Sequence, residues 1–218
     1  MSSIKNELIE YGKKIYDAHL VVGCGGNISV RDGDGVWMKP SGLALYELGE
    51  DDLCGMNLET GEQVAGDLKP TSEVNMHLGI YRVRPDVTAV FHTHSPWLCG
   101  VVSAGIDLSK KVMFAEFIND LGGRATVPYV TPTTQELADL MCEAAKEADS
   151  IFMTNHGFCG LGTTMKQAFF RCLVVEDACQ SLVAATIVGK PQLLKPKQEE
   201  DLMALSGPQH RVKMMESE

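Results

Sequence analysis

The sequence lacks both a long apolar run and a strongly basic region. It has no stretch of eighteen or more consecutive apolar residues, so we expect no membrane-spanning helix. Acidic residues outnumber basic ones by 29 to 19, which gives a net charge of −10 at pH 7. A surface of this sign is not expected to bind nucleic acid or an anionic membrane. An anionic substrate must therefore be held by local groups.

A secretory leader and a disulfide framework are also missing. Residues 2–17 have the pattern of a polar amphipathic helix, which does not resemble a signal peptide. The seven cysteines are odd in number and widely spaced, and no two of them form a Cys-x-x-Cys pair. This usage is typical of reduced, mostly buried thiols. We therefore expect a soluble cytoplasmic protein.

The hydrophobic pattern predicts one α/β domain without internal repeats. We expect helices at 4–19, 71–81, 134–148 and 164–188, and strands at 27–31, 36–39, 87–91, 126–130 and 150–154, with another hairpin at 55–65. Thr71 or Ser72 is expected to cap the second helix, and Thr133 with Glu136 the third. The elements do not alternate strictly, which favours a three-layer α/β/α domain over residues 1–190. The polar segment 191–218 is expected to be a mobile tail.

Two histidines stand at the end of an apolar strand. His92 and His94 follow the run 87–91, and residues two apart in a strand point to the same face. Both imidazoles can therefore reach one metal ion, and His156 after the apolar run 150–153 is a third candidate. Three histidines leave the fourth position open, as in catalytic zinc sites. The alternative is that each histidine is an ordinary core or surface residue.

Three short segments could bind an anion. The glycines at 23–26 do not continue into a dinucleotide-binding fingerprint, because Ile28 stands where the third glycine belongs. They still allow backbone N–H groups to approach an anion, and Asn27 adds amide donors. The turn 41–42 and the helix start at 71–72 supply hydroxyls and further N–H groups. Each segment could equally be a simple turn or cap.

A carboxylate follows the last of these segments. Glu73 could merely compensate the helix dipole, but it would lie beside an anion held at 71–72, where a general acid/base is needed. His77 stands one turn later between apolar residues. We interpret His77 as a packing or supporting residue and not as a metal ligand.

Five motifs, in this order and spacing, resemble the class II aldolase/adducin superfamily: GGNISVR at 25–31, KPSG at 39–42, KPTSE at 69–73, HTH at 92–94 and NHG at 155–157. The resemblance covers about residues 5–190. It implies a central mixed, largely antiparallel sheet covered by helices, and a homotetramer with active sites at subunit interfaces. It also implies zinc ligands His92, His94 and His156, an acid/base Glu73, and a phosphate site formed by Gly26, Asn27, Ser41, Gly42, Thr71 and Ser72. Mn²⁺ or Co²⁺ could replace Zn²⁺, since imidazole accepts several metals.

Within the superfamily, Glu73 and the short chain most resemble the L-fuculose-phosphate aldolases. The implied reaction is retro-aldol cleavage of a ketose 1-phosphate, either like L-fuculose 1-phosphate or a 5-deoxypentulose 1-phosphate. The products would be dihydroxyacetone phosphate and a short aldehyde. One alternative is epimerase, dehydratase or decarboxylase chemistry at the same metal site. Another is an adducin-like interaction module, although that branch lacks the histidines retained here.

The group that protonates the aldehyde side is left open. In the aldolases this role belongs to tyrosines, whereas the corresponding region here reads Val112, Met113 and Phe114. No tyrosine occurs beyond Tyr129, so Tyr129 and His210 are the remaining candidates.

Overall fold

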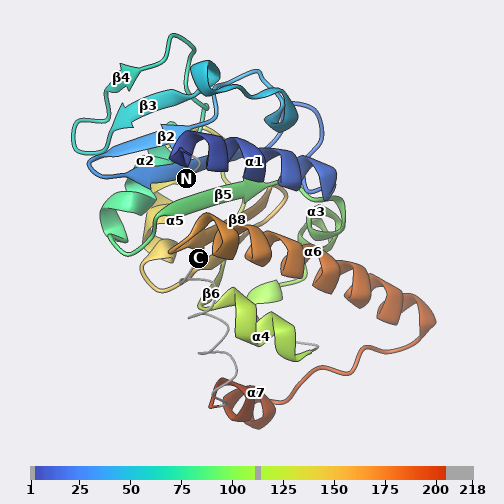
Figure 1. Cartoon of the computed structure of the whole chain (residues 1–218). Helices are drawn as coiled ribbons and strands as arrows, with labels where there is room; N and C mark the ends of the chain where they lie inside the picture. The colour runs from blue at the N-terminus through green and yellow to red at the C-terminus, as the bar shows by residue number, and fades with distance from the viewer. Residues whose placement is uncertain (1–2, 111–113, 205–218) are drawn as a thin grey trace.

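In the computed structural model, which describes residues 3–110 and 114–204, one sheet lies between layers of helices (Figure 1). The helices are α1 (Ile4–Asp17), α2 (Val74–Val83), α3 (Pro96–Ser103), α4 (Ala115–Leu121), α5 (Gln135–Ala145), α6 (Met165–Val188) and α7 (Pro196–Met203), with 3₁₀ turns η1 (Leu45–Glu47), η2 (Glu50–Asp52) and η3 (Leu108–Lys110). The strands are β1 (Asn27–Asp32), β2 (Gly35–Met38), β3 (Cys54–Asn57), β4 (Gln63–Ala65), β5 (Ala89–Thr93), β6 (Arg124–Val127), β7 (Ser150–Met153) and β8 (Gly157–Gly162).

The sheet has the strand order β4-β3-β2-β1-β5-β8-β7-β6. Every neighbouring pair is antiparallel except β6 with β7, which is parallel. The predicted three-layer α/β/α domain with a mixed, largely antiparallel sheet is therefore confirmed. None of the helices described is both long enough and apolar enough to cross a membrane.

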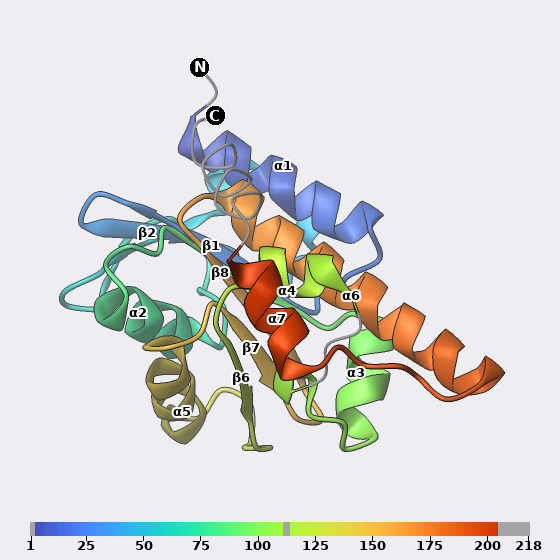
Figure 2. The same cartoon turned by 90° about the horizontal axis from the view of Figure 1, so that it is seen from below.

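Two apolar clusters, one on each face of the sheet, fix the layers. Successive side chains of a strand point to opposite faces, so Val90 and Phe91 of β5 enter different clusters. Phe91 lies in the cluster shared with α1 and α6, and Val90 lies in the cluster shared with α2 and α5. Figure 2 shows these two helix pairs on opposite sides of the strands. By the same alternation, His92 points toward the layer that contains α2.

The structure corrects two predicted helix starts. Glu73, and neither Thr71 nor Ser72, is the N-cap residue of α2, and its side chain makes no capping hydrogen bond. Helix α5 is capped by Thr134, whose hydroxyl accepts from the backbone N–H of Leu137 at 3.2 Å. Thr133 cannot take that place because its φ of 70° is left-handed, whereas an N-cap residue is extended.

Strand β8 and the short helices α3 and α4 were not predicted. Strand β8 has the sequence GFCGLG, and glycine is depleted in strands, so its composition resembles a loop. Helices α3 and α4 have eight and seven residues, too few to show a helical period clearly.

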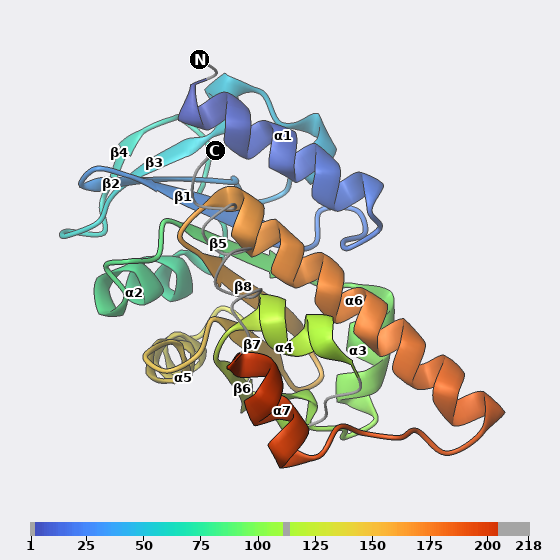
Figure 3. The same cartoon turned by 60° about the horizontal axis from the view of Figure 1, so that its bottom comes forward.

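Part of the predicted tail is helical. Helix α7 lies against α4 (Figure 3), and Arg124 pairs with Glu199 at 3.3 Å. Leu194 and Leu202 pack against the apolar cluster that α1 and α6 share with the sheet. Residues 205–218 lie outside the described part of the chain, and the domain boundary at residue 190 stays a prediction.

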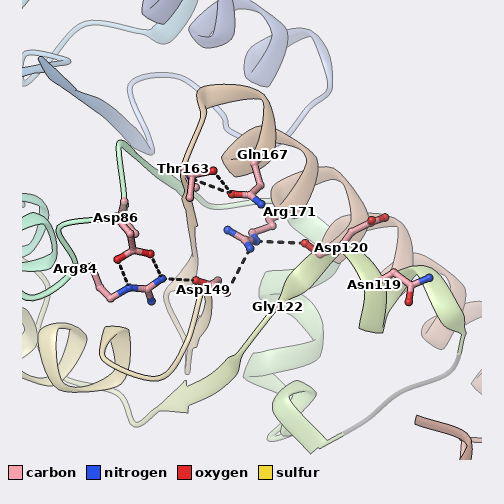
Figure 4. A pocket seen from close by; sticks show the side chains of 11 residues that line it. Arg84, Asp86, Asn119, Asp120, Gly122, Asp149, Thr163, Gln167 and Arg171 are labelled. Carbon is pink, nitrogen blue, oxygen red and sulfur yellow. Dashed lines mark hydrogen bonds and ion pairs between the residues drawn. The ribbon is translucent and has the colours of Figure 1, made fainter. Parts of the chain in front are cut away.

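Helix α6 is tied to the sheet by a buried arginine beside a cavity of about 270 Å³ (Figure 4). Arg171 is 6% exposed and donates to the backbone carbonyls of Asp120, at 3.3 Å, and Leu161. It also pairs with Asp149 at 3.3 Å, and Asp149 in turn pairs with Arg84 at 2.9 Å. Burial lowers the pKa of Arg171, and the Asp149 carboxylate opposes this shift. The interactions join α6 to the start of β7.

We expect Arg171→Met to reduce the free energy of unfolding by about 3 kcal/mol, since the substitution leaves a carboxylate and two carbonyls with fewer donors. Chemical denaturation would measure the loss. The matched control is Lys146→Met, which removes an exposed ion pair with Glu143 and should leave stability unchanged within error. Equal stability of the two variants would contradict the structural role assigned to Arg171.

Candidate metal centre and active site

The three predicted metal ligands meet at the end of β5. His92 lies in β5, His94 follows this strand, and His156 occupies the turn between β7 and β8. Asn155 has a φ of 53°, which lets the chain reverse sharply before His156. One ring nitrogen from each of the three histidines lies within 4.8 Å of the other two. The arrangement brings together residues that are more than sixty positions apart in the sequence.

The charge states of these imidazoles suit a metal ion. The Nδ1–H of His92 donates to the carbonyl of Phe158 at 2.9 Å, and its Nε2 faces Nε2 of His94 at 2.7 Å. Burial lowers the pKa of His94 to about 3 and that of His156 to about 4. Both are therefore neutral near pH 7. Imidazoles that converge in this way fit a divalent transition metal, and three of them leave room for a substrate atom.

Glu73 lies directly against this cluster. Its Oε2 is 3.3 Å from Nε2 of His92, and its Oε1 is 3.5 Å from Nε2 of His156. The side-chain amide of Asn27 donates to Oε2 at 2.9 Å. Burial by itself would raise the pKa of Glu73, but His92 and the Asn27 amide outweigh it and lower the pKa to about 2. The carboxylate is therefore ionised beside the three imidazoles.

A cavity of about 270 Å³ opens next to the cluster. It is lined by every residue predicted for the phosphate site: Gly26, Asn27, Ser41, Gly42, Thr71 and Ser72. Glu73, His94 and His156 line it too. Backbone hydrogen bonds hold two of the turns side by side, from Ser41 N–H to the Lys69 carbonyl at 2.8 Å and from Thr71 N–H to the Lys39 carbonyl at 3.1 Å.

Gly26 is required by the close approach of its loop to β5. Its φ of 68° is left-handed, and a Cβ at this position would lie 2.8 Å from the carbonyl oxygen of His92. The glycine therefore lets the loop reach the end of the strand that carries the histidines. This places a backbone segment of the anion-binding kind beside the metal position.

Sequence reasoning missed three lining residues: Lys39, Pro132 and Thr133. Lys39 is 3% exposed, and its ammonium donates to the carbonyl of Cys24 at 3.0 Å. Burial lowers its pKa from the usual value. The sequence signal that could have identified Lys39 is its position directly before the Pro-Ser-Gly turn. The left-handed Thr133 had no such signal, because its place in the cavity depends on tertiary packing.

Of the candidates for the aldehyde side, Tyr129 is 54% exposed and is absent from the cavity lining. Val112, Met113 and His210 lie outside the described residues.

Comparisons with known proteins agree with this geometry. Residues 6–183 match the family model described as "Class II Aldolase and Adducin N-terminal domain". A 5-deoxy-D-ribulose 1-phosphate aldolase from Bacillus thuringiensis serovar kurstaki is 34% identical over 200 residues, which cover 91% of this chain and 92% of that protein. An L-fuculose phosphate aldolase from Methanococcus maripaludis is 38% identical over 174 residues, covering 80% of this chain and 93% of the relative.

A solved structure of an L-fuculose 1-phosphate aldolase superposes with a TM-score of 0.81 at 30% identity, and the match covers 93% of this chain and 96% of the other. The family match spans most of the sequence, and the structural match covers nearly all of it. The chain therefore belongs to the class II aldolase and adducin N-terminal domain family, as an aldolase.

Proposed function

We propose that this protein catalyses metal-dependent retro-aldol cleavage of a ketose 1-phosphate to dihydroxyacetone phosphate and a short aldehyde. The observation that carries the proposal is the ionised Glu73 held against three convergent imidazoles at the wall of a donor-lined cavity. This combination supplies a proton acceptor, a metal position and an anion site within one small volume. The names of the related aldolases support the same reaction.

The phosphate end of the substrate would lie between the turns. The hydroxyls of Ser41, Thr71 and Ser72 and the backbone around Gly26 and Gly42 offer hydrogen-bond donors. Lys39 adds a positive charge to the cavity wall, in a protein whose net charge is negative. Binding at this end would orient the reacting carbons toward the histidines and Glu73.

Zn²⁺ held by His92, His94 and His156 would supply a Lewis acid that polarises the ketose carbonyl. Cleavage breaks the carbon–carbon bond between the dihydroxyacetone part and the aldehyde part. The hydroxyl of the aldehyde part loses its proton and becomes a carbonyl, and the bonding electrons remain on the dihydroxyacetone part as an enediolate. Glu73, which is ionised in the resting site, would take up one proton from solvent and give it to that carbon in cleavage, and would remove one in condensation. The proton lost by the hydroxyl would leave through the group on the aldehyde side, so the protons gained and lost balance.

We propose zinc as the physiological metal because three imidazoles with an open position are typical of catalytic zinc. We also propose a cytoplasmic homotetramer with active sites at the subunit interfaces, as in the family. A neighbouring subunit would then supply the missing group on the aldehyde side.

A coupled assay for dihydroxyacetone phosphate tests the reaction. We expect the metal-loaded protein to release this product from at least one of L-fuculose, L-rhamnulose, L-ribulose and 5-deoxyribulose 1-phosphates. A chelator should abolish the release. Consumption of a sugar phosphate without dihydroxyacetone phosphate would instead favour epimerisation, dehydration or decarboxylation at the same site. Metal-loaded protein inactive on the whole panel would contradict the aldolase proposal.

A further inference from the structure

Behind Glu73, helix α2 and strand β1 face each other with polar side chains in a buried region. His77 and Tyr81 follow Glu73 at intervals of four residues, so all three lie along one face of the helix. Asn27 and Ser29 are two residues apart on β1 and share one face of the strand. The exposed fractions of the five side chains are between 0% and 6%. The contact between α2 and β1 is therefore lined by polar side chains, whereas buried contacts between a helix and a strand are ordinarily apolar.

The five side chains form one continuous chain of hydrogen bonds that alternates between helix and strand. Tyr81 Oη lies 2.8 Å from Ser29 Oγ, which lies 2.6 Å from Nδ1 of His77. Nε2 of His77 lies 2.5 Å from Oδ1 of Asn27. The amide Nδ2 of Asn27 then donates to Oε2 of Glu73 at 2.9 Å.

The chemistry of the groups sets one direction for the whole chain. Asn27 donates to Glu73, so its carbonyl oxygen faces His77 and can only accept, which requires a proton on Nε2 of His77. Complete burial lowers the pKa of His77 to about 3, so the ring is neutral and Nδ1 carries a lone pair. Ser29 must then donate to Nδ1, which leaves its oxygen as an acceptor. The single proton of the Tyr81 hydroxyl has two acceptors within reach, Ser29 Oγ at 2.8 Å and the Thr88 carbonyl at 3.4 Å, and the shorter contact requires it to donate to Ser29.

The two oxygens of Glu73 differ as a result. Oε2 accepts the hydrogen bond from Asn27, whereas Oε1 is buried and has no hydrogen-bond partner among the described residues. A carboxylate held in this way cannot rotate without breaking the bond to Asn27. Oε1 therefore remains as the oxygen that can exchange a proton with a substrate.

We propose that Ser29, His77 and Tyr81 are positioning residues, which orient the amide of Asn27 and through it present Oε1 of Glu73 to the substrate. This inference rests on the proposed function, since it assigns the chain of hydrogen bonds a role in the proton transfer of that reaction. This chain of hydrogen bonds would hold Oε2 of the carboxylate and leave Oε1, which lies 3.5 Å from Nε2 of His156, without a hydrogen bond. Five polar groups in the core would otherwise be a costly substitute for apolar packing.

The first test measures the direction of the chain without using activity. The ring ¹⁵N chemical shifts of a histidine-labelled protein distinguish protonated from unprotonated nitrogens, and the signals of His77 are assigned by their loss in His77→Gln. We expect a proton on Nε2 and none on Nδ1 at neutral pH. A proton on Nδ1 would overturn the inference, whatever the enzyme catalyses.

The second test compares two substitutions of His77 at equal metal content. The glutamine side chain carries an NH₂ donor group and a carbonyl acceptor, so it can reproduce both contacts of the neutral ring, whereas leucine can reproduce neither. We expect His77→Leu to lower kcat about 10²-fold with KM nearly unchanged, because Glu73 loses its orientation. His77→Gln should recover most of the lost kcat. Equal losses in the two variants, or a loss confined to KM, would contradict the inference.

A matched pair of serine variants separates positioning from stability. Ser29 and Ser150 are both completely buried. The Ser150 hydroxyl takes no part in the chain of hydrogen bonds behind Glu73 and donates instead to the carbonyl of Leu121 at 2.8 Å. Both alanine variants should lose some stability, but only Ser29→Ala should also lower kcat. A similar kcat in the two variants would count against the inference. If the wild-type protein cleaves no ketose phosphate, the proposed function fails and with it the catalytic purpose, while the ¹⁵N shifts still show whether the hydrogen bonds run as described.

Discussion

The Glu73→Gln variant is expected to bind its metal normally and to lose about 10²- to 10⁴-fold in kcat, the range typical of a general acid/base. Glutamine has nearly the same shape as glutamate, and its carbonyl oxygen can still accept from Asn27. It cannot exchange a proton with the substrate carbon, so the loss falls on the chemical step. Steady-state release of dihydroxyacetone phosphate, with metal content determined on the same sample, would measure it.

Glu143→Gln is a suitable control for this variant. Glu143 lies on α5, where it pairs with Lys146 on the surface. Removing its charge changes the net charge as much as Glu73→Gln does, without touching the cavity. We expect wild-type turnover in this control. Comparable turnover in the two glutamine variants would exclude Glu73 as the acid/base.

Removal of the metal is expected to have the second large effect. A Lewis acid contributes several kcal/mol of transition-state stabilisation, so chelated protein should lose at least about 10³-fold in activity. It should also unfold at a lower temperature, because a metal that binds only the folded state stabilises it. Added Zn²⁺ should restore both properties. Titration with Mn²⁺ and Co²⁺ would show whether either metal can replace it.

Substitution of a single ligand should reproduce the effect of the chelator. We expect His94→Ala to purify with less than stoichiometric metal and with activity near that of the chelated protein. The control is His19→Ala, which removes an exposed histidine that contributes no ring nitrogen to the three-imidazole group. Full metal content and activity in His94→Ala would require a different set of ligands. Metal loss in both variants would show that the effect is not specific to the cluster.

Much of the site could be predicted from local sequence patterns. The spacing of His92 and His94 after an apolar strand places both imidazoles at one strand end, because side chains in a strand alternate. The turns at 41–42 and 71–72 are signalled by proline, glycine and hydroxyl residues, and both line the cavity. The helix starts were less accurate, since several neighbouring hydroxyl residues can act as the cap. Strand β8 was missed because its glycines resemble those of a loop.

The sequence alone determined the residue types of the candidate centre, the strand at whose end His92 and His94 stand, and the layered α/β architecture, because these follow from periodicity along the chain. Tertiary structure decided which elements face each other. The packing of α2 on β1 brings His77 between Ser29 and Asn27, and the pairing of two turns places Lys39 in the cavity wall. Neither arrangement has a local signal, since both depend on contacts between segments that are far apart in the sequence. A periodic pattern shows which side of an element is buried, and only the folded structure shows which residues lie opposite it.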